Sequence, residues 1–196
     1  WLFPGQTRSG FVFTNLDEGS KALNVDIVTP SAFVSFTFFV PVPGLKIDHY
    51  EVDWANLYPP DEIIEVDTST LLAAIAQQPC CATDKKAEGT ADPLNLIVIG
   101  TPREVYYSFL RAGWDETEVV SRASLFKTVG SFLTGGEYRY SPVSSLYVFG
   151  RRQDVALQKA RDNIHERNHL RLWMSRARYQ GKPVWIGQIS RDIGVR

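Results

Sequence analysis

The feature that most constrains the fold is a regular alternation of apolar and other residues near the end of the chain. Leu170, Leu172 and Met174 are each separated by one polar or aromatic residue. A period of two places every second side chain on the same face of an extended strand. Residues 169–174 are therefore predicted to form a half-buried strand with these three side chains in the core.

The predicted strand starts at the second histidine of H-E-x-x-H, a zinc-peptidase motif found here at residues 165–169. In those enzymes both histidines lie on one helical face and bind one Zn²⁺, while the glutamate polarises the bound water. A strand from His169 onward removes that face, and no Glu or His follows as a third ligand. We expect no cofactor; the alternative is a zinc-dependent hydrolase with His165 and His169 as metal ligands and Glu166 as catalytic base.

An outward row of side chains on the same strand is the candidate binding surface. His169, Arg171 and Trp173 share the face opposite the leucines, and Trp185 and Arg191 are expected beside them on the return strand. Guanidinium groups bind phosphate or carboxylate through paired hydrogen bonds. The alternative is cross-strand cation–π packing without a ligand. The candidate ligand-binding residues are His169, Arg171, Trp173, Trp185, Arg191 and, from a basic corner, Arg151.

Charge is divided unevenly along the chain. Residues 145–196 hold eleven Lys or Arg and four Asp or Glu, a local charge of +7; the remainder, with ten against eighteen, carries −8. A basic segment that contains aromatic residues suits nucleic acid, anionic lipid or a phosphorylated ligand. Two halves that neutralise each other are the alternative. We expect an anionic lipid or a phosphorylated ligand and no DNA, with any protein partner unknown.

The N-terminal third has the patterns of β-strands. Residues 10–14 and 23–28 alternate around a turn-rich segment, which predicts a hairpin. A third strand is predicted at residues 32–40 and a fourth at residues 46–52, each bounded by turn residues. This part of the chain is therefore expected to be β-rich.

A short helix is predicted from Leu71 and stops before Pro79. The only two cysteines, Cys80 and Cys81, follow it. Neighbouring cysteines rarely bond each other, because their Cα atoms lie about 3.8 Å apart, short of the usual disulfide span. We expect two small unbonded residues, with a redox pair as the alternative.

A polar segment is expected to divide the chain. Residues 82–93 contain no large apolar side chain and are typical of a solvated linker. The predicted boundary lies there, between a β-rich domain of residues 1–81 with one helix and a mixed domain of residues 94–196. In the second domain strands alternate with helices, which predicts an α/β or α+β fold.

The mixed domain begins with a predicted strand at residues 94–99 that leads into a well-marked helix. Thr101 is the cap, Pro102 takes the first helical position, Glu104 closes a capping box and Gly113 ends the helix. The further elements expected are a helix at 121–133, a strand at 146–149, a helix at 155–164 and a hairpin of strands 169–174 and 184–189.

Several short blocks of the second half form a recognisable series. They are Leu94–Gly100, Ala112–Trp114, Ser145–Arg151, His169–Trp173, Pro183–Gly187 and the pair Arg191-Asp192. In this order they resemble the LssY C-terminal domain family over about residues 93–196. The R-x-W and W-x-G strands recur in that family, whereas the first histidine of H-E-x-x-H does not belong to the pattern. Family domains usually continue into a part with another histidine and several acids, which implies a domain truncated at its C-terminus.

The resemblance implies no established activity and no catalytic residue. Family members occur fused to membrane-embedded lipid-phosphatase-like and DedA-like regions in bacteria, which implies a setting at the cell envelope. No apolar run reaches the roughly 18 residues that cross a bilayer, so a soluble portion is expected. We predict a non-catalytic binding or accessory domain that holds an anionic, phosphate-type ligand. An interaction module that uses the sheet edges of the β-rich domain is a third alternative.

Overall fold

The computed structural model describes residues 2–14, 18–119, 142–160 and 166–193. The chain forms two compact units, residues 1–44 and 45–196, which are treated separately below. The helix expected at 121–133 lies outside the described residues. The described elements are mostly β-strands with few helices, so the β-rich character is confirmed and the α/β mixture only in part.

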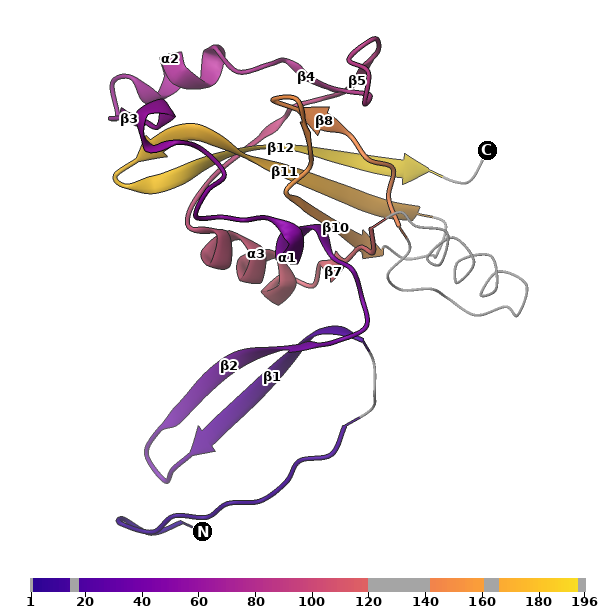
Figure 1. Cartoon of the computed structure of the whole chain (residues 1–196). Coiled ribbons are helices and arrows are strands. Elements are labelled where there is room, and N and C mark those ends of the chain that lie inside the picture. Colours follow the sequence, from indigo (N-terminus) through magenta and orange to yellow (C-terminus); the bar gives the residue numbers. More distant parts are fainter. Residues whose placement is uncertain (1, 15–17, 120–141, 161–165, 194–196) are drawn as a thin grey trace, which may run out of the picture. The chain divides into compact units, whose positions relative to one another are not determined.

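Unit 1 contains one antiparallel hairpin, β1 (Gly19–Val28) and β2 (Phe33–Val42) (Figure 1). The backbone amide of Thr29 donates to the Ala32 carbonyl at 2.8 Å and closes the turn. The strands expected at 23–28 and 32–40 are thus confirmed. The hairpin partner expected at 10–14 is wrong: those residues form no strand, because the closer Thr29–Ala32 turn pairs β1 with β2 instead.

Unit 2 is built on a six-stranded, mainly antiparallel sheet, the main sheet. Across it lie β6 (Leu96–Ile99), β12 (Lys182–Ile193), β11 (Glu166–Tyr179), β10 (Val155–Ala160) and β7 (Asp115–Glu116). The short β3 (Ile64–Val66) pairs in parallel with the far end of β11. The long β11–β12 hairpin is the centre of the unit (Figure 1).

A two-residue turn joins β11 to β12. Gln180 and Gly181 have φ angles of 52° and 73°, as the mirror-image hairpin turns require. Tyr179 is therefore paired with Lys182, and the register continues past a bulge to place Arg171 opposite Gln188. The predicted hairpin is confirmed, and its register decides which side chains share a face.

Helix α3 (Pro102–Arg111) covers one face of the main sheet (Figure 1). Its predicted capping box is present, since Glu104 N–H donates to Thr101 Oγ1 at 3.2 Å and Thr101 N–H donates to Glu104 Oε2 at 2.8 Å. The apolar side chains between helix and sheet form the principal core. Its buried members are Val105, Tyr106, Val155, Leu157, Leu170, Leu172, Met174 and Trp185.

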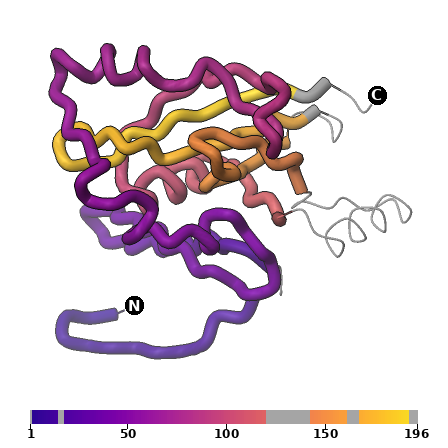
Figure 2. Tube along the Cα trace, turned by 45° about the horizontal axis from the view of Figure 1, so that its top comes forward, coloured from indigo at the N-terminus to yellow at the C-terminus, as the bar shows by residue number. Residues whose placement is uncertain are grey.

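A second, four-stranded sheet covers the opposite face. It consists of β5 (Thr90–Pro93), β4 (Cys81–Thr83), β8 (Tyr147–Val148) and β9 (Arg151–Arg152). In Figure 2 the segment that carries β4 and β5 runs along the yellow strand β12. The strand expected at 146–149 is confirmed. The segment 82–93 is no solvated linker, because it pairs as β4 and β5 and its small Ala82 is buried.

Four shorter segments differ from expectation, confirm it or add to it. Helix α1 (Asp48–Glu51) stands where a strand was expected at 46–52, and Asp48 and His49 are buried in it. Strand β10 stands where a helix was expected at 155–164, because four consecutive residues from Val155 are buried between two layers. Helix α2 (Leu71–Ala76) confirms the predicted helix, while Pro60–Glu62 forms the helical turn η1.

The sulfur atoms of Cys80 and Cys81 form a disulfide, which corrects the expectation of unbonded thiols. Their Cα atoms lie 3.7 Å apart. The pair links α2 to β4, and the Cys80 carbonyl accepts from Leu94 N–H at 2.8 Å. Among the described residues, no helix is long and apolar enough to span a membrane.

Candidate functional site

A polar hollow of about 300 Å³ lies beside β11, where the second sheet meets the main sheet. Its walls come from β5, from the segment before β8, from β11 and from β12, so segments far apart in the sequence build it. The lining residues are Asp92, Pro142, Val143, Ser144, His169, Arg171 and Ser190. We call it the Arg171 pocket.

Arg171 is the buried cation of this pocket, with an exposed fraction of 4%. Its Nη1 donates to Gln188 Oε1 at 2.9 Å, and its Nε and Nη2 donate to the Ser144 carbonyl at 3.2 and 3.1 Å. Nη2 also donates to Ser144 Oγ at 3.2 Å. These bonds fix the plane of the guanidinium, which a binding site for a planar or tetrahedral anion needs.

Gln188 supports Arg171 from the neighbouring strand and is fully buried. Its Oε1 accepts from the guanidinium, but its Nε2 has no hydrogen-bond partner among the described residues. A buried amide donor without a partner costs about 1–3 kcal/mol. The fold therefore keeps an unsatisfied donor directly beside the buried cation.

His169 lies on β11 opposite Ser190 of β12, and both line the Arg171 pocket. The predicted strand through His169 is confirmed, and residues 166–169 do not form the helix on which the zinc motif depends. His165 lies outside the described residues. Within the described part of the chain, no three His, Cys, Asp or Glu side chains are grouped as a metal site requires.

Trp173 shares a strand face with Arg171, as predicted, but that face does not point to solvent. The indole is fully buried against Ala82, Val148 and Ile186, because the second sheet covers it. Its Nε1 donates to the Arg151 carbonyl at 3.4 Å. Trp173 thus belongs to the core between the two sheets.

Trp185 and Arg191 lie on the other face of the hairpin, which corrects the predicted row. Trp185 is opposite Met174 and Arg191 is opposite Asn168, so both share the face of the leucines. Trp185 is fully buried, and its Nε1 donates to the Gly100 carbonyl at 2.8 Å. Arg191 is exposed. Neither side chain lines the Arg171 pocket.

Arg151 belongs to a separate cluster. Its Nε and Nη2 form a bidentate pair with Asp154 at 2.9 and 2.8 Å, Nη1 donates to Tyr58 Oη at 2.5 Å, and Nη2 donates to the Met174 carbonyl at 2.6 Å. Burial alone would lower the pKa of Arg151, but Asp154 raises it above the ordinary value. This guanidinium holds the β9–β10 corner against β11.

A buried polar cluster also surrounds α1. The His49 ring stacks on Tyr106 with centroids 3.8 Å apart, and the Tyr106 hydroxyl donates to Glu116. Burial lowers the pKa of His49 to about 4, and burial raises the pKa of Asp48 despite its ion pair with Arg152. His49 Nδ1 is buried, and no described residue forms a hydrogen bond with it. The cluster joins α1, α3 and β7 and is best explained as packing.

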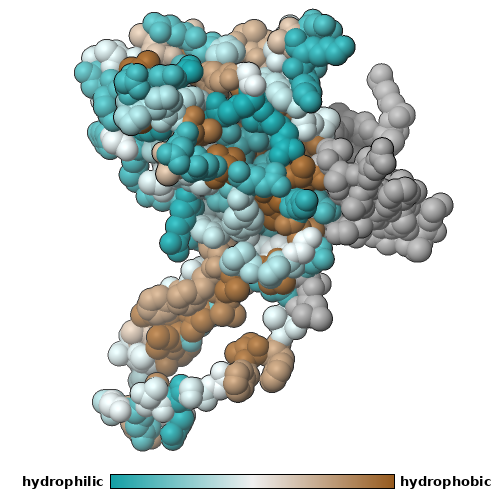
Figure 3. All heavy atoms as spheres, viewed as in Figure 1, coloured by the Kyte–Doolittle hydropathy of each residue, from teal (hydrophilic) through white to brown (hydrophobic). Residues whose placement is uncertain are grey.

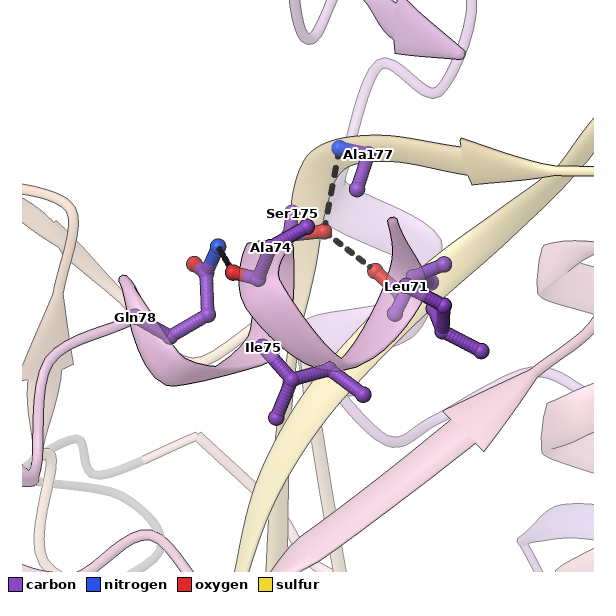
Figure 4. Close-up of a pocket in the computed structure, with 7 residues that line it drawn as sticks. Leu71, Ala74, Ile75, Gln78, Ser175 and Ala177 are labelled. Carbon is purple, nitrogen blue, oxygen red and sulfur yellow. Dashed lines mark hydrogen bonds between the residues drawn. The ribbon is translucent and has the colours of Figure 1, made fainter. Parts of the chain in front are cut away.

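A crevice under α2 offers no room for a ligand, because it leaves no space for a water molecule. Figure 4 shows Leu71 and Ala74 of α2, together with Gln78 just after the helix, beside the bend of β11 at Ser175. There Ser175 Oγ donates to the Val184 carbonyl at 2.7 Å. The Arg171 pocket is therefore the stronger candidate site.

Sequence reasoning found His169 and Arg171 but missed the other polar residues of the pocket. Ser190 could have been found, because the hairpin turn places it opposite His169. Asp92 and Ser144 lie outside the hairpin and carry no local signal. Only the packing of the second sheet brings them to β11.

Comparison with known proteins identifies one relationship. The family model described as LssY C-terminus matches residues 73–196. No curated protein and no solved structure matches the chain. The matched region contains β4 and β5 together with the whole main sheet except β3, so it includes every wall of the Arg171 pocket. Because the match covers more than half of the sequence, the chain belongs to the LssY C-terminus family.

Proposed function

We propose that unit 2 is a non-catalytic binding domain whose Arg171 pocket holds an anionic, phosphate-type group. The observation that carries the proposal is the buried guanidinium of Arg171, oriented by Gln188 and Ser144 at the wall of a polar hollow. A buried cation attracts an anion more strongly than an exposed one, because water screens it less.

Three of the other lining residues support the same ligand, whereas the carboxyl group of Asp92 opposes it. His169 and the hydroxyls of Ser144 and Ser190 are groups that can donate hydrogen bonds to phosphate oxygens. The pocket volume of about 300 Å³ is at the lower end of the range for small-molecule sites. A single phosphate group or a small phosphorylated molecule is therefore the best fit, free in solution or as a lipid headgroup.

The proposed setting is the bacterial cell envelope, where the domain would act as an accessory module. This part of the proposal rests on the fusion of family members to membrane-embedded regions in bacteria. Of the predicted ligand-binding residues, His169 and Arg171 are kept in the proposed site. Trp173, Trp185, Arg151 and Arg191 are assigned to packing or to other surfaces.

Titration calorimetry with inorganic phosphate tests the proposal. We expect saturable binding by the full chain at constant ionic strength, and a loss of about tenfold or more in affinity in Arg171→Gln, since a charged hydrogen bond contributes about 1.5–3 kcal/mol. Ser190→Ala should cause a smaller loss. Arg191→Ala is the matched control, because it removes the same charge from the opposite face.

Equal phosphate affinity in folded Arg171→Gln and in the unaltered protein would refute the proposal. If Arg171→Gln does not fold, Ser190→Ala and His169→Gln decide, since both residues are only partly buried. Vesicles with and without a phosphomonoester headgroup then separate a lipid ligand from a free one.

A further inference from the structure

The hairpin of unit 1 has one apolar face and one mixed face. The register sets three apolar pairs on the first face, which we call the apolar hairpin face: Leu23 and Phe38, Val25 and Phe36, Ile27 and Val34. On the opposite face Thr37 Oγ1 donates to Asn24 at 2.9 Å and Ser35 Oγ donates to Asp26 at 2.6 Å. This second face also carries Ala22, Val28, Phe33 and Phe39, so it is mixed. The three apolar pairs are uninterrupted only on the first face.

Within unit 1, none of the described residues buries the apolar hairpin face. Its six side chains are between 39% and 52% exposed, and Figure 3 shows apolar surface gathered along the hairpin. Among the described residues of unit 1, no apolar side chain is buried. A two-stranded hairpin alone is marginally stable in water, and three or more strands with a buried face are usually needed. Unit 1 thus lacks the core that would stabilise it.

We propose that the apolar hairpin face packs against the same face of a second copy of this chain. Two amphipathic sheets packed face to face form a four-stranded sandwich in which rows of side chains interdigitate. A two-fold axis supplies an identical apolar surface on both sides, which is the commonest symmetry of soluble oligomers. The mixed faces with Asn24 and Thr37 then lie outside.

The area of the apolar hairpin face is consistent with a second copy of the chain as its partner. Six half-covered apolar side chains leave roughly 500 Å² of apolar surface, the size at which a patch on a monomer is often functional. Two copies would bury about twice that area, roughly 1,000 Å², which is the lower limit for a specific interface. The dimer is therefore expected to dissociate on dilution into the micromolar range or below.

Sedimentation velocity of the full chain over a concentration series tests the proposal. The unaltered protein should show a monomer–dimer equilibrium. The double variant Val25→Lys with Phe36→Glu should be monomeric at every concentration, while its opposite charges keep the cross-strand pair attractive. The matched control Asn24→Lys with Thr37→Glu places the same charged pair on the mixed face and should still dimerise.

Three results would overturn the proposal: a monomeric unaltered protein, a dimer that persists in the Val25→Lys, Phe36→Glu variant, or a protein that stays monomeric and binds lipid vesicles through this face. Circular dichroism shows whether the variants fold. If they do not, benzoylphenylalanine at Phe36 should cross-link two copies on illumination, whereas the same group at Phe33 on the other face should not.

Discussion

The side chains of Arg171 and Gln188 meet across β11 and β12, where Nη1 donates to Oε1 at 2.9 Å and both residues are almost fully buried. This bond joins the two central strands at the wall of the polar pocket. Its acceptor is neutral, so the pair keeps a net positive charge. A carboxylate in the same place would cancel that charge and the attraction for an anion.

Replacing Gln188 separates the structural role of this bond from its electrostatic role. Gln188→Leu removes the acceptor and should lower the free energy of unfolding by about 1–3 kcal/mol. Gln188→Glu keeps an acceptor and should retain most of the stability, but it should weaken phosphate binding because it neutralises Arg171. Urea unfolding and calorimetry measure the two effects. Undiminished phosphate affinity in folded Gln188→Glu would contradict the assigned role of Arg171.

Arg151 should matter for stability and not for phosphate binding. Arg151→Ala leaves Asp154, only 2% exposed, without its bidentate partner, and breaking such a pair costs about 3–5 kcal/mol. The double variant Arg151→Ala with Asp154→Ala should lose less stability than the sum of the single variants. The double-mutant cycle is completed by measuring denaturant unfolding of the unaltered protein, of each single variant and of the double variant. Additive losses would show that the two side chains do not interact.

Local signals predicted the elements whose residues determine their own conformation. The alternation around Leu172 predicts the strand β11, and the Thr101–Glu104 capping box predicts where α3 begins. Strand β10 was mistaken for a helix, because a segment buried on both faces lacks alternation. Burial in β10 arises from the layers packed on it, and one segment of sequence does not contain that information.

The candidate site was predicted in part for a similar reason. The face of Arg171 follows from alternation, but the side of Trp185 depends on strand register. The two-residue turn at Gln180 and Gly181 pairs even-numbered residues of β11 with odd-numbered residues of β12, which puts Trp185 on the face of Leu172. That signal was present in the sequence. No such signal places Asp92 at the pocket, because its position there depends on the packing of the two sheets.

His49 should make the stability of the protein depend on pH in a defined window. Its pKa in the folded state is about 4, below the ordinary 6.5, because the ring is buried. Between these values the unfolded state takes up a proton and the folded state does not, so stability is present above pH 6.5 and is lost as pH falls towards 4. The loss should reach at most about 3 kcal/mol.

The variant His49→Phe isolates this effect, since phenylalanine can keep the stacking on Tyr106. The raised pKa of Asp48 acts in the opposite direction, because its folded form takes up a proton more readily than its unfolded form. Asp48 is present in both proteins, so the difference between their free energies of unfolding reports the effect of His49. Chemical unfolding at pH 7.5, 5.5 and 4.5 should show that the free energy of unfolding of the unaltered protein falls relative to that of the variant as the solution becomes more acidic. A difference that does not change with pH would mean that the pKa of His49 is the same in the folded and unfolded states.

His169→Ala should leave the zinc content of the purified protein unchanged and should weaken phosphate binding. Positions four apart in a strand are separated by about 13 Å, too far for two imidazoles to bind one ion, whereas in a helix the side chains are neighbours. Strand β11 begins at Glu166 and contains His169. Elemental analysis by mass spectrometry measures the metal, with Arg191→Ala as control. Stoichiometric zinc that is lost in His169→Ala and kept in Arg191→Ala would instead favour a metal-dependent hydrolase.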